Sequence, residues 1–461
     1  MTDAGILAPR PLPDGPLIAF YGDDFTGSSA VMEVTAFAGL PTVLFLKPPS
    51  PARLAAFRHY RVIGVAGTAR SQSPAWMEAH LPAVFDALAE LGTPIVHYKV
   101  CSTFDSSPEI GSIGRAADIA ARRFPGWTPL IVADPGMQRF QAFGHLFARL
   151  GAEVHRLDRH PTMSLHPVTP MDEADLGRHL ARQTGRRIGL VDLAAMKRGA
   201  AEARLAQELA AGAAIVSLDV IDRETLVAAG RLVWEQGARP TFALGSQGFE
   251  AALVAWWREA GLLPAEPPRR RFGAVDRLAC VSGSVCPVTA DQIAHAQAHG
   301  FAAIRLDAAR LVDAAALASE VERVAAAMLH HLGEGRDAIA FSAAGADDPA
   351  VAALRTAAAT AGVPIETVNE RIGTALGRIL ERTVLTARLS RAVVSGGDTS
   401  GRAVSVLGID ALTAIAPLAP GAPLCRALSE RPEFDGLELA LKGGQVGGPD
   451  FFVAAKTGPM P

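Results

Sequence analysis

The sequence predicts an α/β protein with two domains, each built on a mainly parallel sheet flanked by helices. Two observations support this prediction. Short β-branched or apolar runs alternate with Ala-rich, helix-forming stretches along the chain, which is the pattern of parallel sheets with helical crossovers. A stretch rich in proline and arginine interrupts this alternation past the middle of the chain. The length of 461 residues gives each half enough residues for its own core.

The expected strands can be placed in order along the chain. In the first half they cover residues 17–20, 42–46, 62–67, 95–100, 130–134, 188–192, 214–219 and 241–245, with helices in most of the gaps. After the interruption, further strands are expected at 278–282, 302–306, 338–342 and 392–396, and a last strand-like run lies within 437–455. The interruption itself, Gly261–Arg277, is typical of a linker. We therefore expect domains at residues 1–262 and 275–461.

The composition narrows the class of function. Hydrophobic residues make up 49% of the chain and charged residues 20%, as in globular proteins. The net charge of −3 brings no basic excess for nucleic acid, so we expect a small-molecule partner. The sequence has neither an apolar run of roughly 18 residues nor a signal-peptide pattern, so we expect a cytoplasmic protein without a membrane partner. The four cysteines show no zinc-ligand spacing and should be reduced thiols.

Polar residues follow several expected strands, at the edge where open α/β sheets bind ligands. The stretch YGDDFTGSSA, Tyr21–Ala30, places two adjacent carboxylates between a strand and a small-residue helix start. One of them can simply cap the helix, but adjacent anions repel and one suffices for capping. The second then needs a cation, a metal or a substrate hydroxyl, and a carboxylate that accepts a hydroxyl proton recurs in phosphoryl transfer. We take Asp24 and Asp23 as candidate catalytic residues.

Three further loops of the first half, GTARSQSP, KVCSTFDSSPEIGSIG and DPGMQRF, are also unusually polar. Their mixture of cations, hydroxyls and carboxylates suits a small polyhydroxy acid. Arginine and lysine would hold its carboxylate, while aspartate and serine would bond its hydroxyls. An ordinary surface role stays open for the serine-rich loop. The candidate substrate-binding residues are Arg70, Ser71, Lys99, Ser102, Thr103 and Asp105.

The second half has glycine-rich turns after its expected strands. Glycines let a backbone approach a ligand closely and present successive N–H groups to phosphate oxygens. In SGGDTSGRAV, Gly396 and Gly397 open the turn, Asp398 and Thr399 add polar contacts, and a helix follows whose N-terminus faces the same point. This indicates nucleotide binding. The chain contains no Gly-Lys dipeptide, so a P-loop is excluded, and the metal ligands remain unassigned.

Several motifs, taken together and in order, resemble the four-carbon acid sugar kinase family. They are GDDFTGSSA, KVCSTFDSS, HPVTPM, VSGSVCPVTADQI, SGGDTSG and GGPDFF. The resemblance implies an N-terminal acid-sugar-binding domain, a C-terminal nucleotide-binding domain, an active site in the interdomain cleft, and Mg²⁺ accompanying ATP. It carries nucleotide contacts onto Ser282, Ser284, Gly396, Gly397, Asp398, Thr399, Lys442, Gly444 and Gly447. The sequence departs from the family where Gly443–Gly448 replaces a Ser-Gly-Asn-Phe-Gly-Gly run, and where Glu33 is the displaced later acid of the first loop.

The resulting hypothesis is transfer of the ATP γ-phosphoryl group to the terminal 4-hydroxyl of erythronate, threonate or an oxo-tetronate. One carboxylate of the Asp pair would accept or orient the hydroxyl proton, with Lys99 and Arg70 on the substrate carboxylate and Lys442 and Mg²⁺ on the phosphates. A nucleotide-dependent dehydrogenase of a small hydroxy acid is an alternative, because glycine loops also serve dinucleotides. A non-catalytic sugar-acid sensor is another. The sequence leaves the stereoisomer open, and a homodimer is compatible with it.

Overall fold

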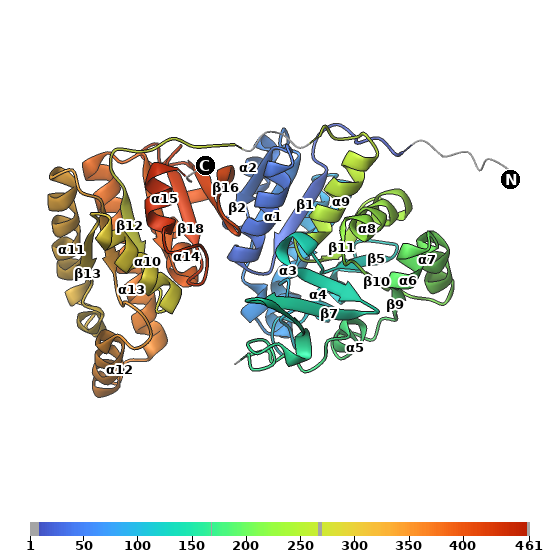
Figure 1. Cartoon of the computed structure of the whole chain (residues 1–461), viewed down its shortest axis with the longest axis horizontal. Helices are drawn as coiled ribbons and strands as arrows, with labels where there is room; N and C mark the ends of the chain where they lie inside the picture. The colour runs from blue at the N-terminus through green and yellow to red at the C-terminus, as the bar shows by residue number, and fades with distance from the viewer. Residues whose placement is uncertain (1–8, 167, 266–269, 459–461) are drawn as a thin grey trace. The chain divides into compact units, whose positions relative to one another are not determined.

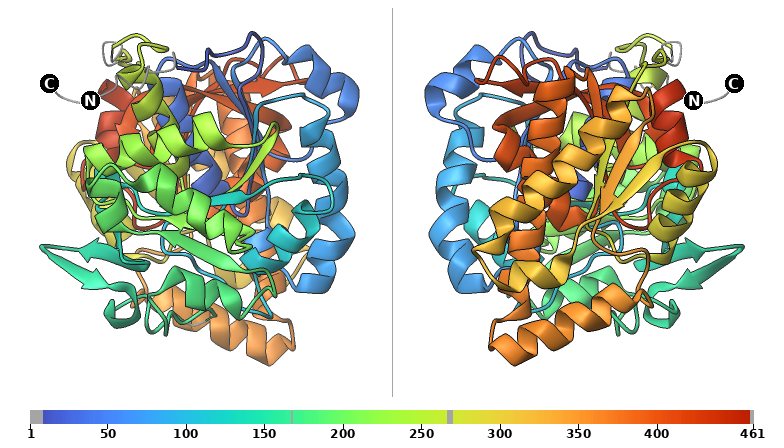
Figure 2. Two further views of the ribbon diagram at one scale, coloured as in Figure 1. Left: turned by 90° about the vertical axis from the view of Figure 1, so that its right-hand side faces the viewer. Right: turned by 90° about the vertical axis from the view of Figure 1, so that its left-hand side faces the viewer.

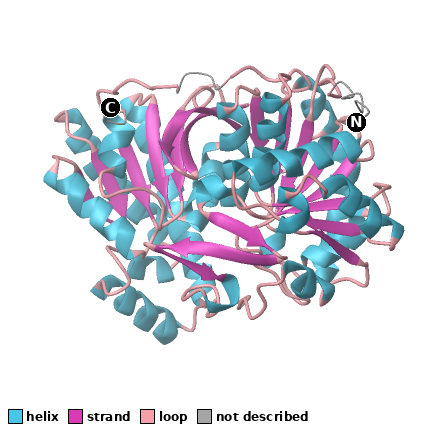
Figure 3. Cartoon of the chain, turned by 45° about the vertical axis from the view of Figure 1, so that its right-hand side comes forward, coloured by secondary structure: helices cyan, strands magenta, loops and turns pink. Residues whose placement is uncertain are grey.

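The computed structural model describes residues 9–166, 168–265 and 270–458, and the alternating pattern of the sequence becomes alternating strands and helices. The described residues form two compact units, one within Met1–Leu44 and Pro48–Pro267 and the other within Phe45–Lys47 and Pro268–Pro461. In each unit helices cover a mainly parallel sheet (Figures 1 and 3). The predicted fold class is therefore confirmed. Among the described helices, none is both long and apolar enough to cross a membrane.

The first unit carries the sheet order β2–β3–β1–β4–β11–β5–β10–β9. Its strands are β1 (Ile18–Gly22), β2 (Thr42–Phe45), β3 (Val62–Ala66), β4 (Ile95–Lys99), β5 (Thr128–Ile131), β9 (Ile188–Val191), β10 (Ile215–Leu218) and β11 (Thr241–Gly245). The neighbours from β3 to β9 pair in parallel. Residues of β1 and β4 are buried throughout, because helices cover both faces of a parallel sheet and its strands become continuous apolar runs.

Most helices of the first unit start at small polar residues that satisfy free backbone N–H groups. Asp24, Ser50, Ser73, Ser112, Asp175, Asp192 and Asp222 are such N-caps. The helices are α1 (Phe25–Phe37), α2 (Pro51–Ala56), α3 (Pro74–Ala89), α4 (Ile113–Ala120), α5 (Leu176–Ala181), α6 (Leu193–Lys197), α7 (Ala201–Ala210), α8 (Arg223–Gln236) and α9 (Gly248–Glu259), with 3₁₀ turns η1 (Ala69–Ser71), η2 (Pro135–Met137) and η3 (Leu157–Arg159). Helix α9 packs against α1 and α8, and α3 packs against α4.

A separate antiparallel sheet of the first unit was not expected from the sequence. It consists of β6 (Arg139–Ala142), β7 (His145–Leu150) and β8 (Glu153–Arg156), and projects from the unit in Figure 2. The β6–β7 turn places Phe143 at φ 49° and Gly144 at φ 79°, the conformation of a tight hairpin turn. Phenylalanine at positive φ is rare, so composition alone does not identify this hairpin.

The second unit has the sheet order β13–β14–β12–β15–β18–β17–β16. The strands are β12 (Ala279–Ser282), β13 (Ala302–Arg305), β14 (Ala338–Phe341), β15 (Arg391–Ser395), β16 (Ile409–Ala419), β17 (Ala422–Ser429) and β18 (Glu438–Lys442). The helices are α10 (Pro287–Ala298), α11 (Ala316–Gly333), α12 (Pro349–Ala361), α13 (Ile365–Ala387), α14 (Gly397–Leu407) and α15 (Phe451–Thr457), with η4 (Ala308–Val312). Along the sheet, the neighbours β13–β14, β14–β12, β12–β15 and β15–β18 pair in parallel. The pairs β18–β17 and β17–β16 are antiparallel.

The long β16–β17 hairpin is the second feature that the predicted strand list lacked. Its turn contains Gly421 at φ 79°, and buried residues alternate with half-buried ones along much of β16. The alanines of β16 obscured this alternation, because alanine is a weak strand former and a strong helix former.

Each sheet has a topological switch point, where the strands that follow in sequence are added on opposite sides of one strand. In the first unit β2 and β3 lie on one side of β1 while β4 lies on the other; in the second, β13 and β14 lie on one side of β12 while β15 lies on the other. Ligands of open α/β sheets bind beyond the carboxyl ends of the strands at such points. The loops after β1 and β4, and those after β12 and β15, are therefore where a site is expected.

Candidate active site

The Asp pair lies directly beyond β1. Gly22 ends the strand, and a Cβ there would overlap the Ser28 side chain, so glycine allows the helix to start at once. Asp23 donates its backbone N–H to the Lys99 carbonyl at 2.9 Å, which fixes the loop against the end of β4. Asp24 is the N-cap of α1, and its Oδ1 accepts the Gly27 N–H at 2.8 Å. The capping role predicted for one of the two residues thus falls on Asp24.

A single arginine joins the two carboxylates. Arg70 Nη2 lies 2.7 Å from Asp23 Oδ1 and 2.9 Å from Asp24 Oδ1, while Nη1 donates to Asp24 Oδ2 at 2.9 Å and Nε to Asp23 Oδ2 at 3.3 Å. Charge-assisted bonds from a planar guanidinium are among the strongest in proteins. Arg70, which was expected to bind a substrate carboxylate, therefore donates from Nε, Nη1 and Nη2 to the Asp pair instead.

The two carboxylates differ in exposure. The Asp23 side chain is 2% exposed and that of Asp24 26%. Burial raises the pKa of Asp23 above its ordinary value, against the opposing charge of Arg70. Burial lowers the pKa of Arg70, but the charges of Asp23 and Asp24 outweigh it, and the pKa rises well above its usual range. Asp24 is thus the carboxylate that an incoming molecule can reach.

Lys99 completes this group at the end of β4. Its side chain is almost fully buried, and Nζ donates to the Val100 carbonyl at 2.5 Å. A Cβ on Gly27 would lie 2.6 Å from Nζ of Lys99 and 2.5 Å from Oδ1 of Asp24. The structure therefore brings Asp23, Asp24, Arg70 and Lys99 together, with Gly27 leaving the space between them.

The loop after β4 is ordered by its own polar contacts. Thr103 Oγ1 donates to Asp105 Oδ1 at 2.7 Å and lies 3.0 Å from Cys101 Sγ. Burial raises the pKa of the Cys101 thiol to about 11, so the thiol stays protonated. Phe104 is fully buried at φ 58°, a strained conformation for a bulky residue that is typical of functional loops. Ser102 lies half-buried in the same loop.

Ser71 takes a different place from the other predicted residues. It is exposed on η1, and its hydroxyl donates to the Thr68 carbonyl at 3.1 Å within its own turn.

Two serines order the loop after β12 in the second unit. Ser282 Oγ accepts the Ser284 N–H at 3.4 Å, and Ser284 Oγ accepts the Cys286 N–H at 3.2 Å and the Thr289 hydroxyl at 3.1 Å. Gly444, in the loop after β18, lies against them, because a Cβ there would be 2.6 Å from Ser284 Oγ. Both serines hold the shape of the loop, and Gly444 is needed for the close approach.

The loop after β15 has the geometry of an anion seat. Gly396 sits at φ 112°, which favours glycine, and α14 begins at the next residue. Apart from its chain neighbours and the backbone of its own helix, none of the described atoms lies within 4 Å of a Cβ placed on Gly397, so there is open space beside the first residue of α14. Thr399 Oγ1 packs against Gly396 and Gly283. The Asp398 side chain lies outside the described part of the structure.

Gly447 serves the fold of the last loop. It has φ 88°, and a Cβ there would overlap the Phe451 ring. Its carbonyl accepts a bond from Gln292 Nε2 at 3.0 Å, as do those of Val446 and Gly448. Gly447 therefore has a structural reason of its own, as Gly396 and Gly444 do.

Lys442 is the buried cation of this edge. Nζ donates to the Ser395 hydroxyl at 3.1 Å, the Thr289 hydroxyl at 3.3 Å and the Gly443 carbonyl at 3.0 Å. Burial lowers the pKa of Lys442 to about 8, with Cys286 acting in the opposite direction. Among the described residues, the Lys442 ammonium bonds neutral oxygens and lies over the Phe451 ring, so an anion would stabilise its charge.

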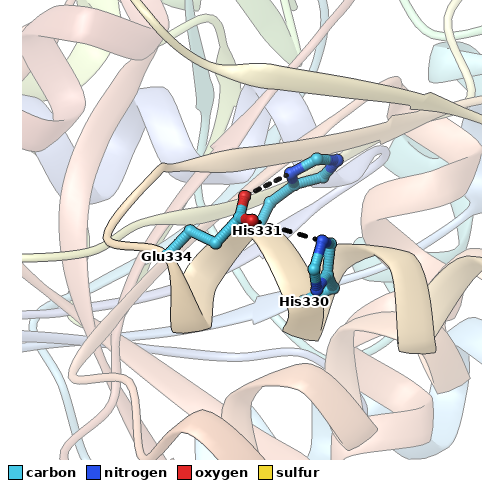
Figure 4. Close-up of side chains that lie close together, drawn as sticks. All are labelled: His330, His331 and Glu334. Atoms are coloured by element: carbon cyan, nitrogen blue, oxygen red, sulfur yellow. Dashed lines mark hydrogen bonds and ion pairs between the residues drawn. The ribbon is translucent and has the colours of Figure 1, made fainter.

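Metal-ligand geometry occurs elsewhere. Within the described residues, the group of histidine and acidic side chains that could hold an ion is His330, His331 and Glu334, at the end of α11 (Figure 4). Its arrangement is explained by two contacts of 3.3 Å, each between a Glu334 carboxylate oxygen and a ring nitrogen of one histidine. Helix α11 leads into the amino end of β14, so the group lies at the sheet edge opposite the glycine loops.

Sequence reasoning missed several residues that shape these loops. Gly27, Thr289, Gln292 and Ser395 were not singled out. The motif VSGSVCPVTADQI contains Thr289 and Gln292, but only the fold shows that they reach the loop after β18. Gly27 carries no chemical group, and only the positions of Asp24 and Lys99 reveal why it is small.

Two family models match the chain. The model described as a sugar-binding N-terminal domain matches residues 18–253, and the one described as a nucleotide-binding C-terminal domain matches residues 279–452. A 3-oxo-isoapionate kinase of Paraburkholderia graminis is 50% identical over 97% of this chain and 95% of its own length. 3-Oxo-tetronate kinases of Cupriavidus necator and Methylobacterium radiotolerans are 30% and 34% identical, over 97% and 93% of this chain and 97% and 96% of their own.

Solved structures share the fold. A Salmonella typhimurium protein superposes with a TM-score of 0.77 at 24% identity, and a Haemophilus influenzae protein with 0.74 at 23%, each over 95% of this chain and 98% of its own. At such identities the likeness shows the fold alone. The family models and the kinases carry the functional conclusion: the chain belongs to the four-carbon acid sugar kinase family, as a phosphotransferase of sugar acids.

Proposed function

We propose that this kinase transfers the γ-phosphoryl group of ATP, with Mg²⁺, to the terminal hydroxyl of a 3-oxo sugar acid of the 3-oxo-isoapionate type. The substrate proposal rests on the 50% identity to a 3-oxo-isoapionate kinase, against 30% and 34% for two 3-oxo-tetronate kinases. A 3-oxo-tetronate is the second candidate. The observation that carries the chemistry is the partly exposed Asp24 carboxylate, held by Arg70 beside a buried Asp23.

On the sugar side, Asp24 accepts or orients the proton of the attacking hydroxyl. Its Oδ1 is fixed by the Gly27 N–H and by Arg70, and its side chain keeps partial exposure. Asp23 positions Arg70 rather than contacting substrate, because both of its oxygens face the guanidinium and it is almost fully buried. The loop after β4 supplies contacts to the sugar hydroxyls through Ser102, Thr103 and Asp105.

On the nucleotide side, the N-terminus of α14 and the loops after β12 and β18 bind the phosphates. The open space beside Gly397, and a helix start at which the described residues provide no side-chain cap, suit an anion. The hydroxyl-rich surroundings at Ser282, Ser284 and Thr399 offer oxygen ligands, which Mg²⁺ prefers. These residues would hold Mg²⁺, which when bound would help to offset the negative charge of the phosphates.

The proposal assigns sugar-acid binding to residues 1–262 and nucleotide binding to 275–461. In-line transfer places the γ-phosphate against the acceptor hydroxyl, so the loop edges of the two sheets must meet during the reaction. The expected active site in the interdomain cleft is thus part of the proposal. Exclusion of water at that moment prevents futile ATP hydrolysis.

A coupled assay of ADP release tests the proposal. Wild-type protein with ATP and Mg²⁺ is offered 3-oxo-isoapionate, 3-oxo-tetronate, erythronate and threonate at matched concentrations. The expected result is ADP release with the highest kcat/KM for 3-oxo-isoapionate. A higher value for 3-oxo-tetronate would overturn the substrate proposal but leave the chemistry standing. ADP release with none of the four would overturn both, and a nicotinamide absorbance change or ligand binding without turnover would favour the dehydrogenase or the sensor.

A further inference from the structure

We propose that Arg139 binds the carboxylate of the sugar acid and so makes the enzyme selective for acids over neutral sugars. This inference rests on the proposed function. Arg139 takes the role that the sequence suggested for Arg70 and Lys99. Arg70 faces the Asp pair instead, and the Lys99 ammonium bonds the Val100 carbonyl.

The backbone places Arg139 at the ligand-binding edge of the first unit. It begins β6, directly after the loop and the 3₁₀ turn that follow β5. Asp134 and Arg139 exchange two backbone hydrogen bonds of 3.0 Å, which fold this segment back on itself. The Asp134 carboxylate accepts the Gln247 amide at 3.1 Å, which joins the segment to the loop after β11. Strand β11 is the neighbour of β4, whose loop carries Thr103 and Asp105.

The guanidinium of Arg139 has hydrogen-bond donors that its surroundings satisfy poorly. Nε is buried and has no hydrogen-bond partner within the described residues. Nη1 donates to the carbonyls of Met137 and Gln138 at 3.3 Å and to that of Arg149 at 3.5 Å, all at the long end of the range. A buried donor without a partner costs free energy, and a ligand oxygen would remove that cost. A carboxylate matches the fork of a guanidinium in geometry and charge.

The charge around Arg139 points the same way. Burial lowers the pKa of Arg139, and the nearby groups Cys101, Asp134 and Asp105 act against that effect without cancelling it. Cys101 stays protonated, Asp105 accepts the Thr103 hydroxyl, and Asp134 accepts the Gly136 N–H. The same guanidinium contributes to the lowered pKa of His160, whose first cause is burial. A bound anion would supply the missing negative charge.

Two variants and one control test the assignment. Arg139→Gln removes the charge and keeps polar atoms, and Arg139→Lys keeps the charge but loses the fork. The control is Arg149→Gln, on the same small sheet, where Arg149 is exposed and its Nε donates to the Gly151 carbonyl. The substrates are the preferred sugar acid and its carboxamide, which has the same hydroxyls and no charge.

The expected signature is a change in preference rather than a general loss. Arg139→Gln should lower kcat/KM for the acid by about 10- to 150-fold, the value of a charge-assisted contact, while kcat/KM for the carboxamide and KM for ATP stay within about threefold. Arg139→Lys should retain part of the preference, and Arg149→Gln all of it. An equal loss for acid and carboxamide, or no loss, would overturn the assignment.

Failure of this inference and failure of the proposed function are separable. If wild-type protein releases no ADP, titration calorimetry with threonate and its carboxamide, without nucleotide, still measures the acid preference. Equal affinity of wild-type protein for both ligands would overturn the role of Arg139. If Arg139→Gln lowers the melting temperature, Arg139→Lys is compared with wild-type protein instead. An undiminished acid preference of Arg139→Lys, together with full affinity, would also overturn the role of Arg139.

Discussion

Arg70 Nη2 lies 2.7 Å from Oδ1 of Asp23, a carboxylate with almost no exposed surface. The same nitrogen reaches Asp24 Oδ1 at 2.9 Å, so one guanidinium holds two adjacent anions. Lys99 adds a second positive charge next to Gly27, which brings the four groups to formal neutrality. This explains how the chain keeps two neighbouring carboxylates at one strand end: Asp23 fixes the arginine, the arginine fixes Asp24, and Asp24 remains within reach of a ligand.

Replacing Arg70 by methionine should destabilise the first unit by about 2–3 kcal/mol, because Asp23 would be left buried without its partner; the partial exposure of Arg70 keeps the loss below that of a fully buried pair. All five tryptophans lie between residues 76 and 257, so urea unfolding followed by tryptophan fluorescence reports on this unit. As a control, Arg122→Met breaks an exposed pair with Glu78 and should change stability by less than about 0.5 kcal/mol. Equal effects of the two variants would contradict the structural role of Arg70.

Asp24→Asn should reduce kcat by about 10²- to 10⁴-fold while nucleotide binding persists, because the amide cannot accept the hydroxyl proton. Asparagine remains a good N-cap, so α1 keeps its start and the effect is not one of folding. Steady-state kinetics with a nucleotide-binding titration measures both. The companion variant Asp23→Asn should act mainly on stability and on the position of Arg70. Near-normal turnover of Asp24→Asn would remove Asp24 from the mechanism.

The parallel core of both units followed from local sequence. Every strand expected in the first half corresponds to a strand of its large sheet, because buried parallel strands are continuous apolar runs between helices. The β6–β8 sheet and the β16–β17 hairpin escaped prediction for different reasons. The first turns at Phe143, an unusual residue at positive φ, and the strands of both have few β-branched residues, so neither has the β-branched pattern that marks a hairpin.

Site chemistry was partly readable from the same motifs. Adjacent acids after a strand indicated a pair with two roles, and the structure places Asp24 in the cap. Which cation faces which anion depends on how distant loops meet, so the pairing of Arg70 with the acids was not visible. The unpartnered Nε of Arg139 was likewise hidden in the loop DPGMQRF, because an unsatisfied donor is a property of packing and not of composition.

Gly27→Ala tests how closely the cluster of Asp23, Asp24, Arg70 and Lys99 is packed. The added methyl would lie 2.5 Å from Asp24 Oδ1 and 2.6 Å from Lys99 Nζ, so one of them must move. A displacement of about 1 Å at a reacting group can cost about 100-fold in rate, and we expect a loss of kcat of that order without loss of ATP affinity. Gly185→Ala, where the methyl meets nothing within 4 Å, should be close to wild type. Full activity of Gly27→Ala would mean that this loop readjusts freely.

Gly444→Ala tests the other loop edge. Its methyl would lie 2.6 Å from Ser284 Oγ and 2.9 Å from Cys286 Cβ, which pushes the loops after β18 and β12 apart. Loss of phosphate contacts should raise KM for ATP by about 10- to 100-fold and leave sugar-acid affinity intact. Gly443→Ala is the matched control, since its methyl meets only Val446 Cγ2 at 3.7 Å. Calorimetry with each substrate separately measures both affinities, and a larger effect on the sugar acid would contradict the assignment of this loop.

The pH dependence of ATP use should follow Lys442, whose pKa burial lowers to about 8. Above pH 8 the ammonium of the free enzyme loses its proton, so kcat/KM for ATP should fall by up to about tenfold per pH unit. Bound phosphate raises this pKa again, which moves the decline in kcat to higher pH. Lys442→Arg keeps its charge and should remove the decline.

Stability should respond to the same group in the opposite sense. The unfolded lysine has a pKa near 10.5, so between pH 8 and 10.5 the unfolded state binds more protons than the folded one. The contribution of Lys442 to stability therefore rises with pH across this window and is lost as pH falls through 8. Because every lysine and tyrosine contributes at high pH, the measured quantity is the difference in unfolding free energy between wild type and Lys442→Met. A wild-type advantage that grows from pH 8 to 10 while ATP use declines would fit a buried, undercompensated ammonium; parallel changes would mean that another group controls ATP binding.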